Sequence, residues 1–268
     1  VPRYWELATE YESRKEALRS LALDPHGVLY REPERLLLDD LDDVARGSSI
    51  LSLVGRGAHR VSEIAGRLGV PATSLSRPFA LLVYLGLLER EAPWGRSARD
   101  SKRSRYRITD PFLRTWFRFV EPERSRLEAG QVEQVSQLTE TRWSAHLGEA
   151  WEDLSRASVA RLTLCGHRWR PASRWWGPGT DRRPLEIDLV AESVEDPTTV
   201  LCGEAKLSAG SRDVARCLAE LRTKAEHCPA LTNRSIHCAV WVLRRRGAIG
   251  QPDVVSAVDV VGSTLGQA

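Results

Sequence analysis

Two stretches in the C-terminal half of the chain decide the fold: Glu186-Ile187-Asp188-Leu189-Val190-Ala191 and Cys202-Gly203-Glu204-Ala205-Lys206-Leu207. We predict that each forms a β-strand, in which residues two apart face the same side. Glu204 and Lys206 therefore point together. Asp188 lies on a strand that can pair with theirs through the turn around Asp196-Pro197. Two carboxylates and a lysine are expected to converge at one place.

Carboxylates and a lysine in this arrangement suit phosphodiester hydrolysis. Buried charges are costly unless they are paired or bind a metal ion. We predict that Asp188 and Glu204 hold Mg²⁺ or Mn²⁺, which polarises the phosphate and helps to form hydroxide. Lys206 would position the attacking water or offset the charge on the phosphate. The alternative is a simple surface ion pair between Glu204 and Lys206 on an exposed strand face.

The segments around these strands predict an α/β block over residues 143–268. Helical periodicity predicts a helix over 143–162 and an amphipathic helix over 213–226. Strands are predicted over 169–176, 186–191, 200–206 and 235–243, and a further one over 253–261. Trp175 and Trp176 stand at a strand end, and we expect them to pack in the core or at its rim.

This order of elements, with Asp188 and then Glu204-Ala205-Lys206, resembles the PD-(D/E)xK nuclease superfamily. The resemblance implies a restriction-endonuclease-like fold, metal binding by the aspartate and the ExK strand, and a catalytic lysine. It also implies that a glutamate on the first core helix assists, a position that Glu152 matches better than Glu149. Glu186 faces the same side as Asp188 and is expected to support or replace it. Many members of this superfamily keep the fold and lose the activity.

Residues 46–108 show the order of a winged helix. Helices are predicted over 49–54, 61–68 and 72–85, the last closed by Gly86. Strands are predicted over 87–92 and 106–108, with a polar loop between them. Helix, helix, turn, helix and hairpin is the winged-helix arrangement.

The predicted winged helix offers residues for DNA contact. The early polar positions of its third helix are Thr73, Ser74, Ser76 and Arg77, where a recognition helix meets a major groove. The wing loop supplies the phosphate contacts that we predict for Arg96, Arg99, Lys102, Arg103 and Arg105. From Arg90 to Arg107 there are seven Lys and Arg residues against two acids. The alternative is a solvated hairpin on a module that contacts only protein.

A wider resemblance covers nearly the whole chain. The segments that carry it are Val1-Pro2-Arg3-Tyr4-Trp5, Tyr106-Arg107-Ile108-Thr109-Asp110-Pro111-Phe112, Trp116-Phe117-Arg118-Phe119-Val120 and Arg174-Trp175-Trp176-Gly177. They resemble the C-terminal half of archaeal-type AAA ATPases, including the portion called domain of unknown function 234. The resemblance implies a helical ATPase-lid remnant over 1–45, the winged helix over 46–108, a helical connector over 109–142 and the nuclease-like domain over 143–268.

The chain lacks the ATPase signature itself. No G-x-x-x-x-G-K-[ST] motif occurs in its 268 residues, so we expect no ATP binding through a P-loop. The chain begins at Val1 and contains no methionine, so we expect it to be part of a longer polypeptide. An upstream ATPase domain or a separate ATPase partner is therefore expected.

Composition restricts the remaining possibilities. The formal net charge is only +3, so nucleic-acid binding must depend on local basic patches. Five cysteines without a CxxC pair favour a reducing, cytoplasmic setting. No long apolar run or signal peptide is visible, so no membrane contact is expected.

Three functions remain open from the sequence. The first is a DNA-binding, metal-dependent endonuclease. The second is a non-catalytic DNA-binding regulator, in which a degenerate nuclease fold serves for homo-oligomerisation. The third is a protein-interaction tail that controls an ATPase partner. Metal binding would separate the first from the others, and salt-dependent DNA binding would separate the second from the third.

Overall fold

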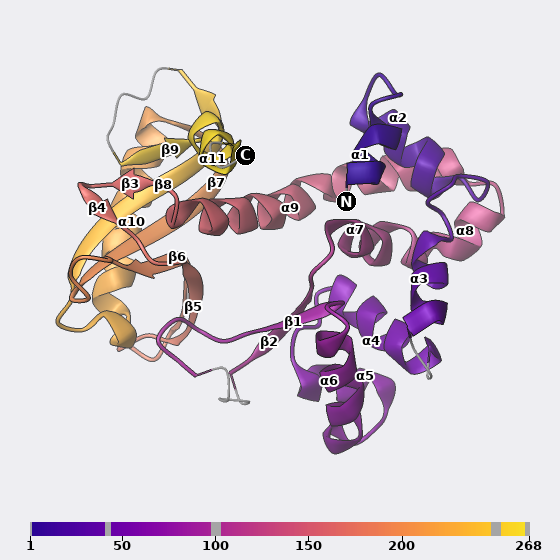
Figure 1. Cartoon of the computed structure of the whole chain (residues 1–268), viewed down its shortest axis with the longest axis horizontal. Coiled ribbons are helices and arrows are strands. Elements are labelled where there is room, and N and C mark those ends of the chain that lie inside the picture. Colours follow the sequence, from indigo (N-terminus) through magenta and orange to yellow (C-terminus); the bar gives the residue numbers. More distant parts are fainter. Residues whose placement is uncertain (1, 41–43, 98–102, 248–252, 266–268) are drawn as a thin grey trace. The chain divides into compact units, whose positions relative to one another are not determined.

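The chain folds into two compact units of mixed α+β structure (Figure 1). The computed structural model describes residues 2–40, 44–97, 103–247 and 253–265. The N-terminal unit comprises Val1–Glu91 and Ser104–Ser144, and the sheet unit comprises Ala92–Arg103 and Ala145–Ala268. Hydrophobic cores lie within each unit. Across the described residues, every helix is too short or too polar to traverse a lipid bilayer.

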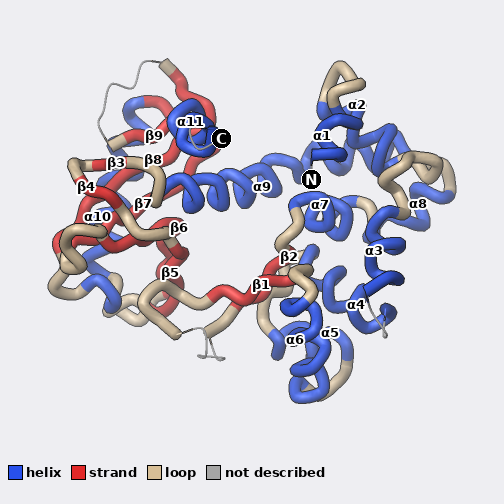
Figure 2. The backbone as a smooth tube through the Cα atoms, in the orientation of Figure 1, coloured by secondary structure: helices blue, strands red, loops and turns tan. Residues whose placement is uncertain are grey.

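Helices dominate the N-terminal unit, with one short hairpin (Figure 2). In chain order they are α1 (Pro2–Ala8), α2 (Arg14–Leu18), α3 (Glu32–Asp40), α4 (Val44–Gly55), α5 (Val61–Leu68), α6 (Ser76–Tyr84), α7 (Pro111–Phe119), α8 (Arg124–Glu128) and the start of α9 (Val132–Val159). A 3₁₀ turn, Ala72–Leu75, precedes α6. The hairpin pairs β1 (Leu88–Glu91) with β2 (Arg105–Ile108) in antiparallel register.

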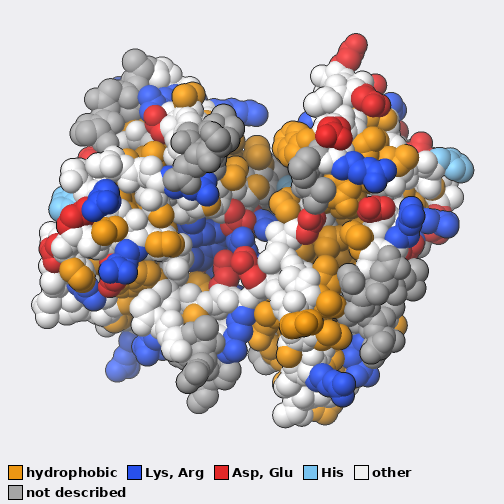
Figure 3. All heavy atoms as spheres, viewed as in Figure 1, with side chains coloured by type: hydrophobic (Ala, Val, Ile, Leu, Met, Phe, Trp, Pro, Cys, Tyr) orange, Lys and Arg blue, Asp and Glu red, His pale blue; other side chains and the backbone are white. Residues whose placement is uncertain are grey.

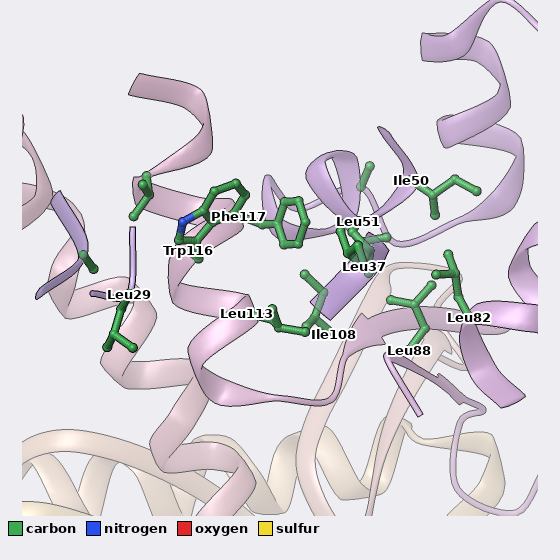
Figure 4. Close-up of a cluster of buried hydrophobic side chains, with 14 of the residues drawn as sticks. Leu29, Leu37, Ile50, Leu51, Leu82, Leu88, Ile108, Leu113, Trp116 and Phe117 are labelled. Atoms are coloured by element: carbon green, nitrogen blue, oxygen red, sulfur yellow. The ribbon is translucent and has the colours of Figure 1, made fainter. Parts of the chain in front are cut away.

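The amphipathic helix α7 contributes several side chains to the core of this unit, and its first residue is well defined. The side chain of Asp110 accepts a hydrogen bond from the Leu113 N–H, and Pro111 occupies the first turn. Trp116 and Phe117 are buried, and the Trp116 indole donates to the carbonyl of Tyr30 at 2.8 Å. Figure 4 shows these two rings in the same cluster as side chains of α3, α4, α6 and the hairpin.

One five-stranded sheet organises the sheet unit. Its strands are β5 (Ser173–Pro178), β6 (Pro184–Glu192), β7 (Thr199–Gly210), β8 (Ser235–Arg246) and β9 (Val254–Ser256), in that spatial order. β5, β6 and β7 are antiparallel neighbours, whereas β7, β8 and β9 are parallel. β3 (Thr163–Leu164) and β4 (His167–Arg168) pair with each other in a separate two-stranded sheet. The parallel pair β7–β8 requires a crossover, which α10 (Ser211–His227) supplies.

Helices cover both faces of the sheet. On one face, Val214, Leu218 and Leu221 of α10 pack on even-numbered residues of β7 and β8, including Cys202 and Val240. On the other face, residues of α9 and α11 (Ala257–Leu265) pack on odd-numbered positions of β7 and β8. Trp241 of β8 is completely buried there, and its indole donates to the hydroxyl of Ser158 at 3.0 Å. Alternation along the two strands thus assigns each side chain to a face.

Most expected elements are present, but several of their bounds differ. The helix predicted over 49–54 begins earlier, at Val44. The helix predicted over 143–162 begins earlier, at Val132, because Val132 and Val135 continue its apolar spacing. The strand predicted over 169–176 begins at Ser173, and Trp169 makes only an isolated bridge to Ser193. The strand predicted over 253–261 is wrong beyond Ser256, where α11 begins. The burial expected for Trp175 and Trp176 is confirmed.

Candidate active site

The two predicted carboxylates come together on neighbouring strands. β6 and β7 pair with Leu189 opposite Gly203 and Val190 opposite Cys202. Asp188 and Glu204 are the next residues along the two strands after this pair. The Oδ2 of Asp188 accepts a hydrogen bond from the backbone N–H of Ala205 at 3.1 Å, which fixes the carboxylate against β7.

Glu204 is held by two lysines, one on each carboxylate oxygen. Lys206 Nζ donates to its Oε1 at 2.8 Å, and Lys224 Nζ donates to its Oε2 at 2.8 Å. The Glu204 side chain is only 14% exposed. Burial by itself raises the pKa of this carboxyl, but the hydrogen bonds from Lys206 and Lys224 outweigh burial and bring the pKa below its usual value. Glu204 is therefore a stably ionised group.

Lys206 points to the same place as Glu204, as its spacing of two residues predicts. Burial disfavours its charged form, but the hydrogen bond and charge of Glu204 dominate and raise the pKa of Lys206 above its usual value. Its side chain remains 39% exposed, so the ammonium also faces solvent. A ligand phosphate could reach it without a change of fold.

Asp188 has a different environment although it faces Glu204. Burial raises its pKa, and the negative charge of Glu204 raises it further. The Ala205 N–H and the cations Lys224 and Arg174 act in the opposite direction but do not cancel these effects. Asp188 therefore accepts a proton more readily than an ordinary aspartate.

Glu152 joins the cluster from α9. Its carboxylate pairs with Arg174 of β5 and lies 3.7 Å from Arg156 Nη1. Burial and then the charge of Asp188 raise the pKa of Glu152 to about 7, against the lowering effect of both arginines. A carboxyl with this pKa exchanges a proton near neutral pH, which is the property of a general acid or base. The helix position predicted for Glu152 thus lies beside Asp188.

Glu186 was the predicted support or replacement for Asp188. Its Oε1 lies 3.5 Å from Arg174 Nε, on the arginine that also pairs with Glu152. The Glu186 side chain is 43% exposed. Arg174 thus links Glu186 to Glu152, and Glu186 lies at the outer edge of the cluster.

Three cations of the cluster were missed from the sequence, and Arg174, the partner of Glu152 and Glu186, is the first of them. Arg156, which is 9% exposed, donates to the backbone carbonyl of Asp188 at 3.1 Å and pairs with Asp153. Its position four residues after Glu152 on one helix was a usable signal, because such residues are neighbours on the helix surface. Lys224 belongs to α10, and no local spacing connects it with Glu204. Acidic and basic side chains also occur together on the visible face of the sheet unit (Figure 3).

The donor set only partly resembles a metal site. Within the ranges that the structure describes, no group of three or more His, Cys, Asp and Glu side chains is arranged to hold a metal ion. Asp188 and Glu204 supply carboxylate oxygens, the donors that Mg²⁺ and Mn²⁺ prefer. Each Glu204 oxygen accepts one lysine hydrogen bond, and a carboxylate oxygen has a second lone pair. The chemistry of these two residues therefore fits a hard cation.

The residues predicted to contact DNA divide into three groups. Thr73, Ser74, Ser76 and Arg77 are all exposed, on the 3₁₀ turn and the first turn of α6. Arg96 is exposed and Arg105 is half-buried on β2. Arg99 and Lys102 lie outside the described residues.

The loop between β1 and β2 is anchored at its ends within the sheet unit. The Trp94 N–H donates to the carbonyl of Arg174 at 2.9 Å, and the Trp176 indole donates to the carbonyl of Arg103 at 3.1 Å. The guanidinium of Arg234 lies 5.9 Å from the Trp94 ring centroid. Trp94 therefore packs on the sheet unit. Arg103 is half-buried with its carbonyl engaged, while its side chain retains partial exposure.

A separate apolar cavity of about 450 Å³ lies in the N-terminal unit. It is lined mainly by α1, α2 and α7, with the aromatic residues Tyr4, Trp5, Tyr11, Phe112 and Trp143. None of the predicted site residues lines it. The cavity is therefore distinct from the carboxylate–lysine cluster.

Comparisons with known proteins find related sequences but give no activity and assign no site. Residues 116–218 match the model of the family called domain of unknown function 234, described as archaea bacterial proteins of unknown function. The match includes Glu152, Asp188, Glu204 and Lys206 but ends before Lys224. An uncharacterized protein of Methanocaldococcus jannaschii is 24% identical over 200 residues, which cover 73% of this chain. The aligned part spans 43% of that relative. No solved structure matches.

Proposed function

We propose that this chain is a DNA-binding protein whose sheet unit is a Mg²⁺-dependent endonuclease of the PD-(D/E)xK type. The observation that carries the proposal is the pairing of β6 and β7, in which Asp188 accepts a hydrogen bond from the Ala205 N–H, between Glu204 and Lys206. Strand order and the α10 crossover are compatible with that fold. The flanking helix supplies Glu152, the fourth residue expected for such a site.

Each residue has a chemical role in this proposal. Asp188 and Glu204 would hold the metal, which when bound polarises a phosphate and acidifies a water molecule. Lys206, with its half-exposed ammonium, stabilises negative charge on the scissile phosphate. Glu152, with a pKa of about 7, accepts or returns a proton near neutral pH. Arg156 holds the Asp188 backbone in place through its carbonyl.

The N-terminal unit would bind the DNA. The succession α4, α5, α6 and the β1–β2 hairpin supports a winged helix. In this proposal Thr73, Ser74, Ser76 and Arg77 approach the major groove, since all four side chains are exposed. Arg96, an exposed residue of the hairpin loop that belongs to the sheet unit, would add phosphate contacts. An ATPase partner or upstream ATPase domain remains part of the proposal.

The test is cleavage of plasmid and single-stranded DNA in the presence of Mg²⁺ or Mn²⁺. Asp188→Asn, Glu204→Gln and Lys206→Met should each abolish cleavage while the fold and DNA binding survive. Glu192→Gln is the matched control, because Glu192 is a partly exposed acid farther along the same strand and pairs with Arg234. Calorimetry should show Mg²⁺ binding that Asp188→Asn removes. Absence of both cleavage and metal binding would exclude the nuclease.

A second candidate is a non-catalytic DNA-binding regulator. The observation in its favour is that Glu204 and Glu152 already have cationic partners, Lys206 with Lys224 and Arg174 respectively. Ion pairs of this kind can stabilise the fold without taking part in catalysis. DNA binding that weakens with salt, without cleavage or metal binding in the same assays, would establish this candidate.

A further inference from the structure

Beyond Lys206, the sheet continues into a cluster of arginines. β7 and β8 pair in parallel with Lys206 beside Val242, Ser208 beside Arg244 and Gly210 beside Arg246. Val240 and Val242 face α10, so alternation along β8 puts Arg244 and Arg246 on that same face. A contact confirms the direction, because Arg246 Nη2 lies 2.7 Å from Asp213 Oδ2 on α10. Both arginines are exposed.

The first turns of α10 add two more exposed arginines, Arg212 and Arg216. Arg216 lies 3.4 Å from Asp213 and 3.9 Å from Glu220, so Asp213 is shared between Arg216 and Arg246. Among the residues that the structure describes, Arg212 and Arg244 have no acidic partner. The neighbouring Arg245 points to the opposite face, 3.9 Å from Asp259 of α11. The α10 face at this end of the sheet therefore carries an excess of positive charge.

We propose that Arg212, Arg244 and Arg246, here called the arginine row, bind the phosphate backbone of a nucleic acid that extends from Lys206. The inference rests on the proposed function for its starting point, the phosphate at Lys206. Residues two apart on a strand are about 7 Å apart, so Lys206, Arg244 and Arg246 present cations at successive steps along the parallel pair. Guanidinium groups match phosphate oxygens in a two-pronged geometry.

The existing ion pairs of the arginine row would not prevent phosphate binding. Arg246 is 65% exposed and Asp213 is 32% exposed. Exposed pairs of this kind contribute little to stability, so a phosphate group can replace the carboxylate as the partner of Arg246. Asp213 also accepts a hydrogen bond from the Gly210 N–H at 3.0 Å and thereby stays tied to the start of α10.

A nucleic acid fits this surface better than a lipid membrane. Ser208 and Gly210, the residues of β7 beside the arginines, offer no apolar side chain that could enter a bilayer. The cations follow a strand instead of spreading over a broad plane. A linear polyanion can contact them in sequence, whereas separate headgroups gain nothing from such an order.

The test measures binding of the full chain to fluorescent duplex and single-stranded oligonucleotides by anisotropy, without divalent metal, over a series of salt concentrations. The double variant Arg244→Ala/Arg246→Ala should weaken binding by roughly tenfold at low salt and reduce the slope of log Kd against log salt by about 2. Its matched control is Arg170→Ala/Arg183→Ala, which removes two exposed arginines elsewhere in the sheet unit. The control should change affinity less than twofold.

A variant that should bind more tightly is also needed, because misfolding can explain a loss of affinity but not a gain. Asp213→Asn keeps a side-chain acceptor for the Gly210 N–H but removes the charge that neutralises Arg216 and Arg246. We expect it to tighten binding severalfold. Equal losses in the double variant and its control, or no effect of Asp213→Asn, would overturn the proposal. So would arginine-dependent binding to phosphatidylglycerol vesicles without arginine-dependent binding to oligonucleotides.

These outcomes are independent of catalysis. If the arginine row governs binding but no variant or metal gives cleavage, the row is supported and the nuclease proposal fails. If cleavage requires Asp188 and Lys206 but nucleic-acid binding does not depend on the arginines, the nuclease proposal is supported and the proposal for the arginine row fails.

Discussion

Asp188 and Glu204 lie on the neighbouring strands β6 and β7, yet their pKa values move in opposite directions. Both are partly buried, and burial taken alone acts to raise the pKa of each carboxyl. Glu204 receives hydrogen bonds from two ammonium groups, whereas Asp188 receives one backbone N–H and faces the charge of Glu204. Facing carboxyls with diverging pKa values are typical of sites that perform acid–base chemistry.

The first prediction concerns Lys224. Lys224→Met should lower the free energy of unfolding by about 1–3 kcal/mol at pH 7, because a largely buried Glu204 oxygen loses its charged donor. Urea denaturation followed by tryptophan fluorescence measures the change. Lys224→Arg should recover part of the loss. In a double-mutant cycle, Lys224→Met should have a much smaller effect in the Glu204→Gln background. Equal effects in both backgrounds would contradict the ion pair.

The second prediction concerns pH. Glu152 has a pKa of about 7 in the folded state against 4.5 as its ordinary value, so the folded chain holds the proton more tightly than the unfolded chain. Its contribution therefore favours folding below about pH 4.5 and is lost as the pH rises toward 7. At about 1.4 kcal/mol per pKa unit, the difference amounts to roughly 3 kcal/mol.

Glu152→Gln should remove this dependence. Across pH 5, 6, 7 and 8, the unfolding free energy of the variant should rise relative to that of the wild type and level off above pH 7. Urea titrations of both proteins at each pH provide the measurement, and their difference cancels other titrating groups. Parallel curves would show that Glu152 titrates normally.

The third prediction concerns Gly203, the residue before Glu204. A Cβ at this position would lie 2.5 Å from Cζ3 of Trp241 and 3.1 Å from Cβ of Leu189. Gly203→Ala should destabilise the protein by about 1–3 kcal/mol, because the buried indole cannot move freely. The tryptophan emission spectrum should shift as well. The control is Gly148→Ala in α9, where nothing lies within 4 Å and the substitution should be neutral or stabilising.

The fourth prediction concerns the start of α11. The Asp259 carboxylate accepts from the Ser256 N–H at 2.7 Å, and Ser256 Oγ accepts from the Asp259 N–H at 3.3 Å. Asp259→Ala should cost about 0.5–2 kcal/mol in thermal or urea denaturation, since this reciprocal cap is lost. Asp259→Asn should retain most of the stability. If the alanine and asparagine variants lose the same stability, the charge and not the cap is the important property.

The same cap explains the main error in predicting the fold from sequence. The apolar residues after Asp253 resemble a strand, but Ser256 and Asp259 have the spacing of a capping box and begin a helix. The signal was present in the sequence and was outweighed by the β-branched valines. By contrast, the β6 and β7 pairing could be predicted, because alternation and a turn are local properties.

In the candidate site, too, the residues on neighbouring strands could be predicted from the sequence, and those from distant elements could not. Asp188, Glu204 and Lys206 lie on two consecutive strands, so their meeting follows from one hairpin. Lys224 reaches Glu204 from a different element, after the chain has crossed over the sheet. The arginines at the end of β8 look like a simple charged run in sequence. Only the parallel register with β7 aligns them with Lys206.

The mixed direction of the strands also sets an order of assembly. β6 and β7 are joined by a tight turn in which the Thr199 N–H donates to the carbonyl of Asp196 at 3.0 Å, so little chain entropy is lost when they pair. β8 can pair with β7 only after the α10 crossover has brought it back to the sheet. Contacts between residues this far apart in sequence form more slowly. We therefore expect the two acids to meet early in folding, while Lys224 is still unanchored. For a while the nascent chain would hold the two carboxyls with Lys206, on the same strand as Glu204, as their nearby cation, and the second charged donor to Glu204 would arrive only with α10.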